Sequence, residues 1–191
     1  MSVTHPYQSV SPTHRVAVFL SFFALTLALM IVLLLIDVPL QTTAAPRGIV
    51  SYELAGSVTE AQRILASWNP TARLYAAFSL GLDYLYMPAY AIAIGLACAW
   101  AAELWSKRRG WLALVGVGLA WGLMVAALCD AIENVALVTM LLSGVREPWP
   151  AVAFGCAALK FALIGAGLVY ALIGGVAWLR SRLRANQHLA S

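Results

Sequence analysis

The sequence contains few charged residues, and this scarcity excludes an ordinary soluble domain. Asp, Glu, Lys and Arg make up 10% of the 191 residues, whereas hydrophobic residues make up 62%. Soluble domains carry about 25% charged residues. No long charged or low-complexity tract interrupts the chain. The composition therefore predicts a single integral-membrane domain that crosses the bilayer several times.

The signatures of common catalytic and cofactor sites are also missing. The histidines, at positions 5, 14 and 188, fall outside the apolar stretches, so a bis-histidine haem or a histidine-based metal site has no support. P-loop, nucleophile-elbow and zincin motifs do not occur, and the segment DAIEN at 130–134 lacks the Glu-x-x-His of di-metal helical bundles. Three cysteines without a Cys-x-x-Cys spacing give no sign of a disulfide framework. We therefore expect no bound metal and no cofactor.

Four apolar stretches are long enough to cross a bilayer as helices, which takes about 20 residues each. The predicted spans cover about residues 15–36, 71–105, 111–142 and 151–179. The first is too long for the apolar part of a usual signal peptide, and Pro46 would directly follow a cut after Ala45, so we interpret it as a span. The fold prediction is an all-α, polytopic membrane protein in which residues 15–180 form one four-helix transmembrane bundle.

Basic residues gather at the ends of these spans. They are His14, Arg15, Lys107, Arg108, Arg109, Arg180, Arg182 and Arg184. By the positive-inside rule, this distribution predicts that both termini are cytoplasmic. Residues 1–14 are expected to form a loose tail, and residues 181–191 a basic tail. Because the positive charge belongs to span ends, the net charge of +4 does not indicate a nucleic-acid partner.

One substantial loop, residues 37–70, is expected on the outer side. Ser57 and Glu60 have the spacing of a capping box, which opens a helix. The segment VTEAQRILASW at 58–68 has too few apolar residues to span. We expect a short interfacial helix that Trp68 anchors at the membrane surface. It is either a packed connector or a lid over the outer mouth of the bundle.

Five polar side chains interrupt the apolar spans. They are Asp83, Asp130, Glu133, Asn134 and Lys160. An ionisable group at the bilayer centre costs about 2.5–3.5 kcal/mol on insertion scales, so such groups usually face a partner or a water-filled cavity. At 1.5 Å per residue, these side chains lie roughly 13–18 Å below the outer ends of their helices. We therefore expect them to meet in one layer, in the outer half of the membrane.

These residues also fall on compatible helix faces. Asp130, Glu133 and Asn134 follow the i, i+3, i+4 spacing of a single face, and Asp83 shares a face with Tyr86 and Tyr90. We expect Lys160 to pair with Asp130 or Glu133, and Asn134 to bridge the remaining groups. The candidate polar-core or ligand-binding residues are Asp83, Tyr86, Tyr90, Asp130, Glu133, Asn134 and Lys160.

Three carboxylates and one ammonium in this core leave a formal excess of two negative charges. An unpaired carboxylate out of water is costly, so a carboxyl takes up a proton, water reaches the site, or a cation resides there. Our first hypothesis is a non-enzymatic membrane protein whose core binds a small ligand, a lipid headgroup or an ion. The alternatives are a purely structural salt-bridge network, a subunit of a larger membrane complex, and an intramembrane enzyme. Such an enzyme would act on a lipid or isoprenoid, with Asp130 or Glu133 as general acid or base and Asp83 positioning water or substrate.

Glycines reduce the width of two predicted spans, 111–142 and 151–179. Gly118 and Gly122 form a G-x-x-x-G, and further glycines lie at positions 165, 167, 174 and 175. Such residues let helix backbones approach closely in lipid. The close contact is either within the bundle or between copies, so a homo-oligomer stays open.

Three stretches of the sequence resemble a group of small bacterial membrane proteins of uncharacterised activity. The stretches are GIVSYELAGSVTEAQRILASW, GLDYLYMPAY and CDAIEN, and the similarity covers about residues 48–140. The resemblance implies a location in the bacterial inner membrane, with membrane lipid as the surroundings. It carries over no catalytic residue.

Overall fold

The computed structural model describes the backbone of residues 4–106 and 109–190. Its described residues form helices and connecting turns without a strand. The elements are α1 (Pro12–Asp37), the 3-10 helix η1 (Val38–Leu40), α2 (Ile49–Glu53), α3 (Val58–Ser67), α4 (Pro70–Ser106), α5 (Gly110–Ser143) and α6 (Trp149–Ala190). The all-helical prediction is confirmed.

Four helices in the described part of the chain are long and apolar enough to cross a membrane. These candidate spans are Pro12–Leu40, Pro70–Ser106, Gly110–Ser143 and Trp149–Leu183. The predicted spans 71–105 and 111–142 end within one residue of the observed α4 and α5. The agreement has a physical cause, because an apolar segment without water must satisfy its backbone hydrogen bonds internally, as a helix does.

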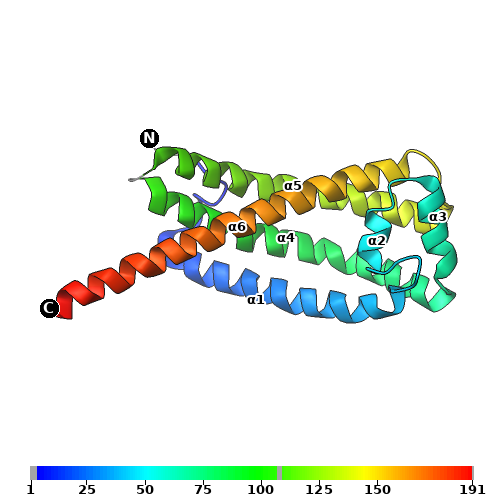
Figure 1. Ribbon diagram of the computed structural model, residues 1–191, viewed down its shortest axis with the longest axis horizontal. Coiled ribbons are helices and arrows are strands. Elements are labelled where there is room, and N and C mark those ends of the chain that lie inside the picture. Colours follow the sequence, from blue (N-terminus) through cyan, green and yellow to red (C-terminus); the bar gives the residue numbers. More distant parts are fainter. Residues whose placement is uncertain (1–3, 107–108, 191) are drawn as a thin grey trace.

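α4 lies at the centre of the bundle. α1, α5 and α6 all pack against it, and α5 and α6 also pack against each other. In the apolar stretch of α4, 61% of the residues are buried, against 6% in α1. Figure 1 shows α6 crossing the bundle obliquely toward the end at which both ends of the chain lie. α1 therefore covers one side of α4 and presents most of its apolar surface outward.

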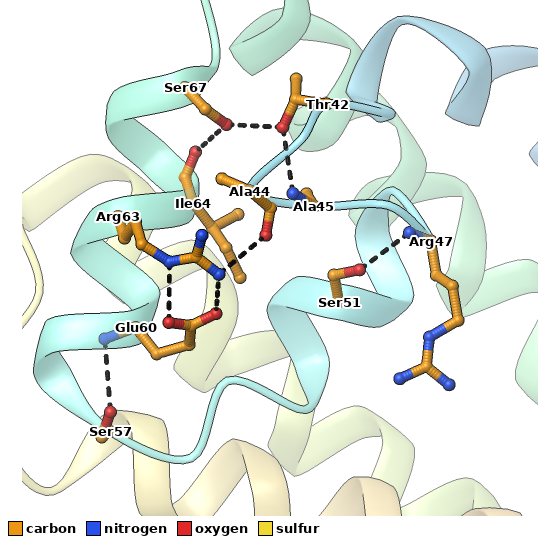
Figure 2. Close-up of polar contacts among 10 residues, drawn as sticks. All are labelled: Thr42, Ala44, Ala45, Arg47, Ser51, Ser57, Glu60, Arg63, Ile64 and Ser67. Atoms are coloured by element: carbon orange, nitrogen blue, oxygen red, sulfur yellow. Dashed lines mark hydrogen bonds and ion pairs between the residues drawn. The ribbon is translucent and has the colours of Figure 1, made fainter.

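α2 and α3 close the opposite end of the bundle (Figure 1). The Ser57 hydroxyl accepts a hydrogen bond from the Glu60 backbone N–H at 3.3 Å, which is half of the predicted capping box. The Glu60 carboxylate does not return to Ser57 but pairs with Arg63 (Figure 2). The loop before α2 is held to α3 by a hydrogen bond of 2.8 Å between the hydroxyls of Thr42 and Ser67 (Figure 2).

The prediction for Trp68 as a surface anchor is wrong. Its side chain is only 3% exposed, and its indole N–H donates to the carbonyl of Leu40 at 2.8 Å. The ring also packs edge-on against Tyr52, with ring centroids 5.3 Å apart. A buried indole needs an acceptor for its single donor, and the turn of η1 supplies one. Trp68 therefore packs α3 onto the bundle from inside.

The segment before α1, expected to be a loose tail, differs from the prediction. Tyr7 is buried, and its hydroxyl donates to the carbonyl of Ala91 at 2.8 Å, so the segment before α1 is packed on α4 rather than loose. At the other end, the predicted span 151–179 continues as helix to Ala190. Residues after Gly175 include no Gly or Pro to interrupt the helix.

The glycines divide into packed and unpacked positions. A Cβ on Gly122 would lie 3.1 Å from Leu163, and one on Gly174 would lie 2.3 Å from the Ala101 Cβ. Gly118, Gly165 and Gly175 meet nothing within 4 Å. The close approach of backbones is thus intramolecular at Gly122 and Gly174, where α6 meets α5 and α4.

Candidate functional site

Lys160 of α6 is the centre of a buried charged cluster. Its side chain is 6% exposed, and its ammonium Nζ donates to Asp130 Oδ1 at 2.7 Å and to Glu133 Oε1 at 3.0 Å. A third carboxylate oxygen, Glu53 Oε2, lies 3.5 Å from Nζ. The expected pairing with Asp130 or Glu133 is therefore observed with both, and Glu53 joins them.

A second set of hydrogen bonds extends the cluster onto α4. The amide of Asn134 donates to Asp83 Oδ2 at 2.8 Å, as the expected bridge. The hydroxyl of Tyr90 donates to Asp130 Oδ2 at 3.0 Å, and Tyr86 packs beside Tyr90 with ring centroids 5.3 Å apart. All seven residues predicted as the polar core lie in or beside this cluster.

The helix directions explain why these side chains meet. α4 and α6 start, and α5 ends, at the end of the bundle where α3 lies. Counted from that end at 1.5 Å per residue, Asp83, Asp130 and Lys160 are each about 16–20 Å along their helices. Similar depths on packed helices place the three side chains in one layer.

Glu53 is the functional residue that sequence reasoning missed. It lies in the loop between the first two spans, at the end of the five-residue helix α2, and is 8% exposed. Two contacts hold this helix. The Asp37 carboxylate accepts the first backbone N–H of α2, from Ile49, at 2.7 Å, and the Tyr52 hydroxyl donates to the carbonyl of Leu137 at 3.3 Å. The only sequence signal is the apolar run around Glu53 in GIVSYEL, which is unusual for an exposed loop.

Glu53 makes the cluster more acidic than the sequence indicated. Four carboxylates, on Glu53, Asp83, Asp130 and Glu133, face the one ammonium of Lys160, which leaves a formal excess of three negative charges. Burial raises the pKa of Glu53, because the charged carboxylate loses hydration, and the nearby Lys160 opposes this shift. The cluster therefore favours an additional positive charge or proton.

The cluster also lacks hydrogen-bond donors. Three buried acceptor atoms have no hydrogen-bond partner among the described residues: Glu133 Oε2, Asn134 Oδ1 and Glu53 Oε2, the last of which is ion-paired with Lys160 Nζ at 3.5 Å. Leaving a buried acceptor unsatisfied costs about 1–3 kcal/mol, and native structures contain few such atoms. Two of these acceptors, Glu133 Oε2 and Asn134 Oδ1, have neither a hydrogen bond nor an ion pair among the described residues, so the cluster holds fewer donors than acceptors.

A cavity of about 270 Å³ opens beside the cluster. Its polar lining comes from Asp37, Glu53, Asp83, Asp130, Asn134 and Lys160, and its apolar walls come from α1 and α6. Glu53 and Asn134 both line the cavity, and Asn134 also carries a buried acceptor without a hydrogen-bond partner. A small group that carries donors fits this arrangement.

The geometry favours binding over proton transfer. Glu133 is completely buried, holds Lys160 and does not line the cavity. Asp130 lines the cavity, but Lys160 and Tyr90 already donate to both of its oxygens. Among the side chains that the structure describes, no three His, Cys, Asp or Glu form a group that could hold a metal ion.

Comparisons with known proteins leave the site to be interpreted from its own geometry. No protein-family model matches the chain, and neither a curated protein nor a solved structure is significantly similar to it.

Proposed function

We propose that this chain is a multi-pass protein of the bacterial inner membrane with both termini in the cytoplasm. Four helices of spanning length support the multi-pass arrangement. The basic residues at the ends of α1 and α6 support the orientation, because they lie at the same end of the bundle (Figure 1). In this orientation α2 and α3 cover the outer end, with α3 at the membrane interface.

We further propose that the buried cluster binds a small ligand through an ammonium group. The observation that carries this proposal is the cavity lined by Glu53, Asp83 and Asn134, where carboxylates outnumber the one ammonium and Asn134 Oδ1 has no donor. An ammonium supplies both missing elements, since it brings a positive charge and N–H donors. A purely structural network would satisfy its own acceptors, as buried polar groups normally do.

The first test replaces a carboxylate that lines the cavity. Asp83→Asn keeps the shape of the side chain and removes its charge, so methylammonium should bind roughly tenfold more weakly. Saturation-transfer NMR on the purified protein measures this weak binding directly. Because Asp83 is only half-buried, the melting temperature of the variant should stay close to that of the wild type.

Glu103→Gln is the matched control. Glu103 is a carboxylate at the opposite end of α4, where it pairs with Arg15 at 2.7 Å, so its loss should leave methylammonium binding unchanged. Equal binding by the wild type and Asp83→Asn would refute the assignment of the ammonium to this cavity. Loss of binding in both variants would point to a general charge effect instead.

Binding should also depend on pH through Glu53. The raised pKa of this carboxyl means that it holds a proton above its ordinary range near 4.5 and is then neutral. As the pH rises through the shifted pKa, Glu53 ionises and the ammonium binds more tightly, because the proton and the ammonium compete for one charge. Methylammonium stays protonated well above neutral pH, so its own titration does not interfere.

A titration of methylammonium binding between pH 5 and 8 checks this prediction. The charged groups that face Glu53 are Lys160 and Glu133 in contact range and Asp130 and Asp83 farther along the cluster. Glu53→Gln should flatten the pH profile, whereas Glu103→Gln should retain it. A profile that keeps its full slope in Glu53→Gln would show that another of these groups titrates.

A further inference from the structure

The cavity beside the charged cluster adjoins two apolar cavities. A second cavity, of about 380 Å³, shares Met30, Tyr86, Tyr90 and Ile164 with the polar one. A third, of about 640 Å³, shares Phe19, Ala97 and Ala171 with the second. The shared lining residues place the three cavities next to one another along α4. We call the second and third together the α1–α6 groove, because α1 and α6 form its sides and α4 its floor.

The dimensions of the groove suit one hydrocarbon chain. Along α4 it extends from Tyr86 to Leu104, which is about 27 Å at 1.5 Å per residue. Half of a bilayer's hydrocarbon core is about 15 Å thick, so a full-length chain fits with room to spare. Its described lining is apolar apart from Thr26, the two tyrosines beside the polar cavity and Glu103 at the far end.

The negative charge at the end of the groove beside the cluster favours one kind of ligand head group. The groove extends from the apolar floor of Ala93 and Ala97, past Tyr90, toward the cluster, which holds four carboxylates and one lysine. A phosphate would be repelled by this excess of negative charge, whereas an ammonium would be attracted. Glu53, which is 92% buried, lines this end, and its Oε2 lies 3.5 Å from Lys160 Nζ. These features disfavour a phospholipid and favour an amine without a phosphate.

We infer that the ligand is a single-chain amphiphile, with an ammonium head among Glu53, Asp83 and Asn134 and a hydrocarbon tail in the α1–α6 groove. This inference rests on the proposed binding of an ammonium group and adds the tail. The open side of the groove lets such a molecule enter laterally from the membrane.

The test compares the binding of methylammonium, which has no tail, with the binding of dodecylammonium, which has one. The protein is reconstituted in phosphatidylcholine nanodiscs, and retention of tritiated dodecylammonium is measured as a function of its mole fraction. Ala171→Phe inserts a ring into the groove where its two cavities meet, and should raise the half-saturating mole fraction at least fivefold while leaving methylammonium binding unchanged. Ala158→Phe places the same ring on an exposed position of α6 away from the groove, and should change neither.

A second measurement locates the tail. Dodecylammonium with a terminal bromine should quench a saturable part of the tryptophan fluorescence, because Trp100 and Trp178 line the far part of the groove. Ala171→Phe should remove this saturable part of the quenching, and Asp83→Asn should shift it to a higher mole fraction of the ligand. Quenching that stays proportional to ligand and never saturates would place the tail in bulk lipid and overturn the inference.

The outcomes separate this inference from the proposed function. Methylammonium binding without any effect of Ala171→Phe on dodecylammonium would refute the tail site and leave the ammonium site standing. Failure of both probes to bind would refute both. Displacement of dodecylammonium by phosphatidylethanolamine in the nanodisc would replace the single-chain amine by a phospholipid, which also overturns the inference.

Discussion

Replacing Lys160 with methionine should lower the free energy of unfolding by about 3–5 kcal/mol, the range found when one partner of a buried ion pair is removed. The ammonium contacts Asp130, Glu133 and Glu53 within 3.5 Å, and methionine offers none of them a donor. The carboxylates would then face one another without a counter-charge. Titration with sodium dodecyl sulfate, followed by tryptophan fluorescence, measures the loss of stability.

Two variants test the cause of this loss. Glu133→Gln in the Lys160→Met background removes one of the repelling charges, so it should recover part of the stability. Arg63→Met removes a cation from the exposed pair with Glu60 and should cost at most about 1 kcal/mol, as surface pairs do. If Lys160→Met unfolds at the wild-type detergent concentration, the ion pairs do not hold α5 and α6 together.

Gly48→Ala should lower the free energy of unfolding by about 3 kcal/mol and withdraw Glu53 from the cluster. Gly48 has a φ of +52°, where a side chain adds about 1–3 kcal/mol of backbone strain. A Cβ there would also lie 2.1 Å from the Asp37 carboxylate. That carboxylate accepts the first N–H of α2, so the clash and the strain both displace the helix that carries Glu53. Chemical unfolding and the pH profile of methylammonium binding measure the two effects.

Gly144→Ala measures the cost of backbone strain without the clash with Asp37 that Gly48→Ala adds. Gly144 has a φ of +85°, but a Cβ there would meet nothing within 4 Å, so this variant reports the backbone term alone. Asp37→Ala reports the loss of the hydrogen bond to Ile49 without a clash. Gly48→Ala should exceed Gly144→Ala in its cost and should flatten the pH profile as Glu53→Gln does. Equal costs for the two glycine variants would mean that Asp37 does not position α2.

The polar core illustrates how far sequence reasoning reaches. The i, i+3, i+4 spacing put Asp130, Glu133 and Asn134 on one face, and helix rise put Lys160 at their depth. Both inferences use only regular helix geometry, which holds along a continuous apolar segment. The sequence did not predict the position of Trp68. A tryptophan next to the end of a predicted span is usually a membrane anchor, and no sequence pattern shows that the carbonyl of Leu40 lies close enough to accept its indole N–H.

The sequence by itself determined the four long helices and the layer in which their charges meet, because hydrophobic length and helical spacing are local properties of the chain. Tertiary structure alone decided that Glu53 enters the core, that Lys160 holds three carboxylates rather than one, and that a groove runs from the cluster between α1 and α6. The position of Glu53 depends on the path of the loop at 38–69. Contacts between distant residues set that path, among them Asp37 with Ile49 and Tyr52 with Leu137, and no local pattern specifies such contacts.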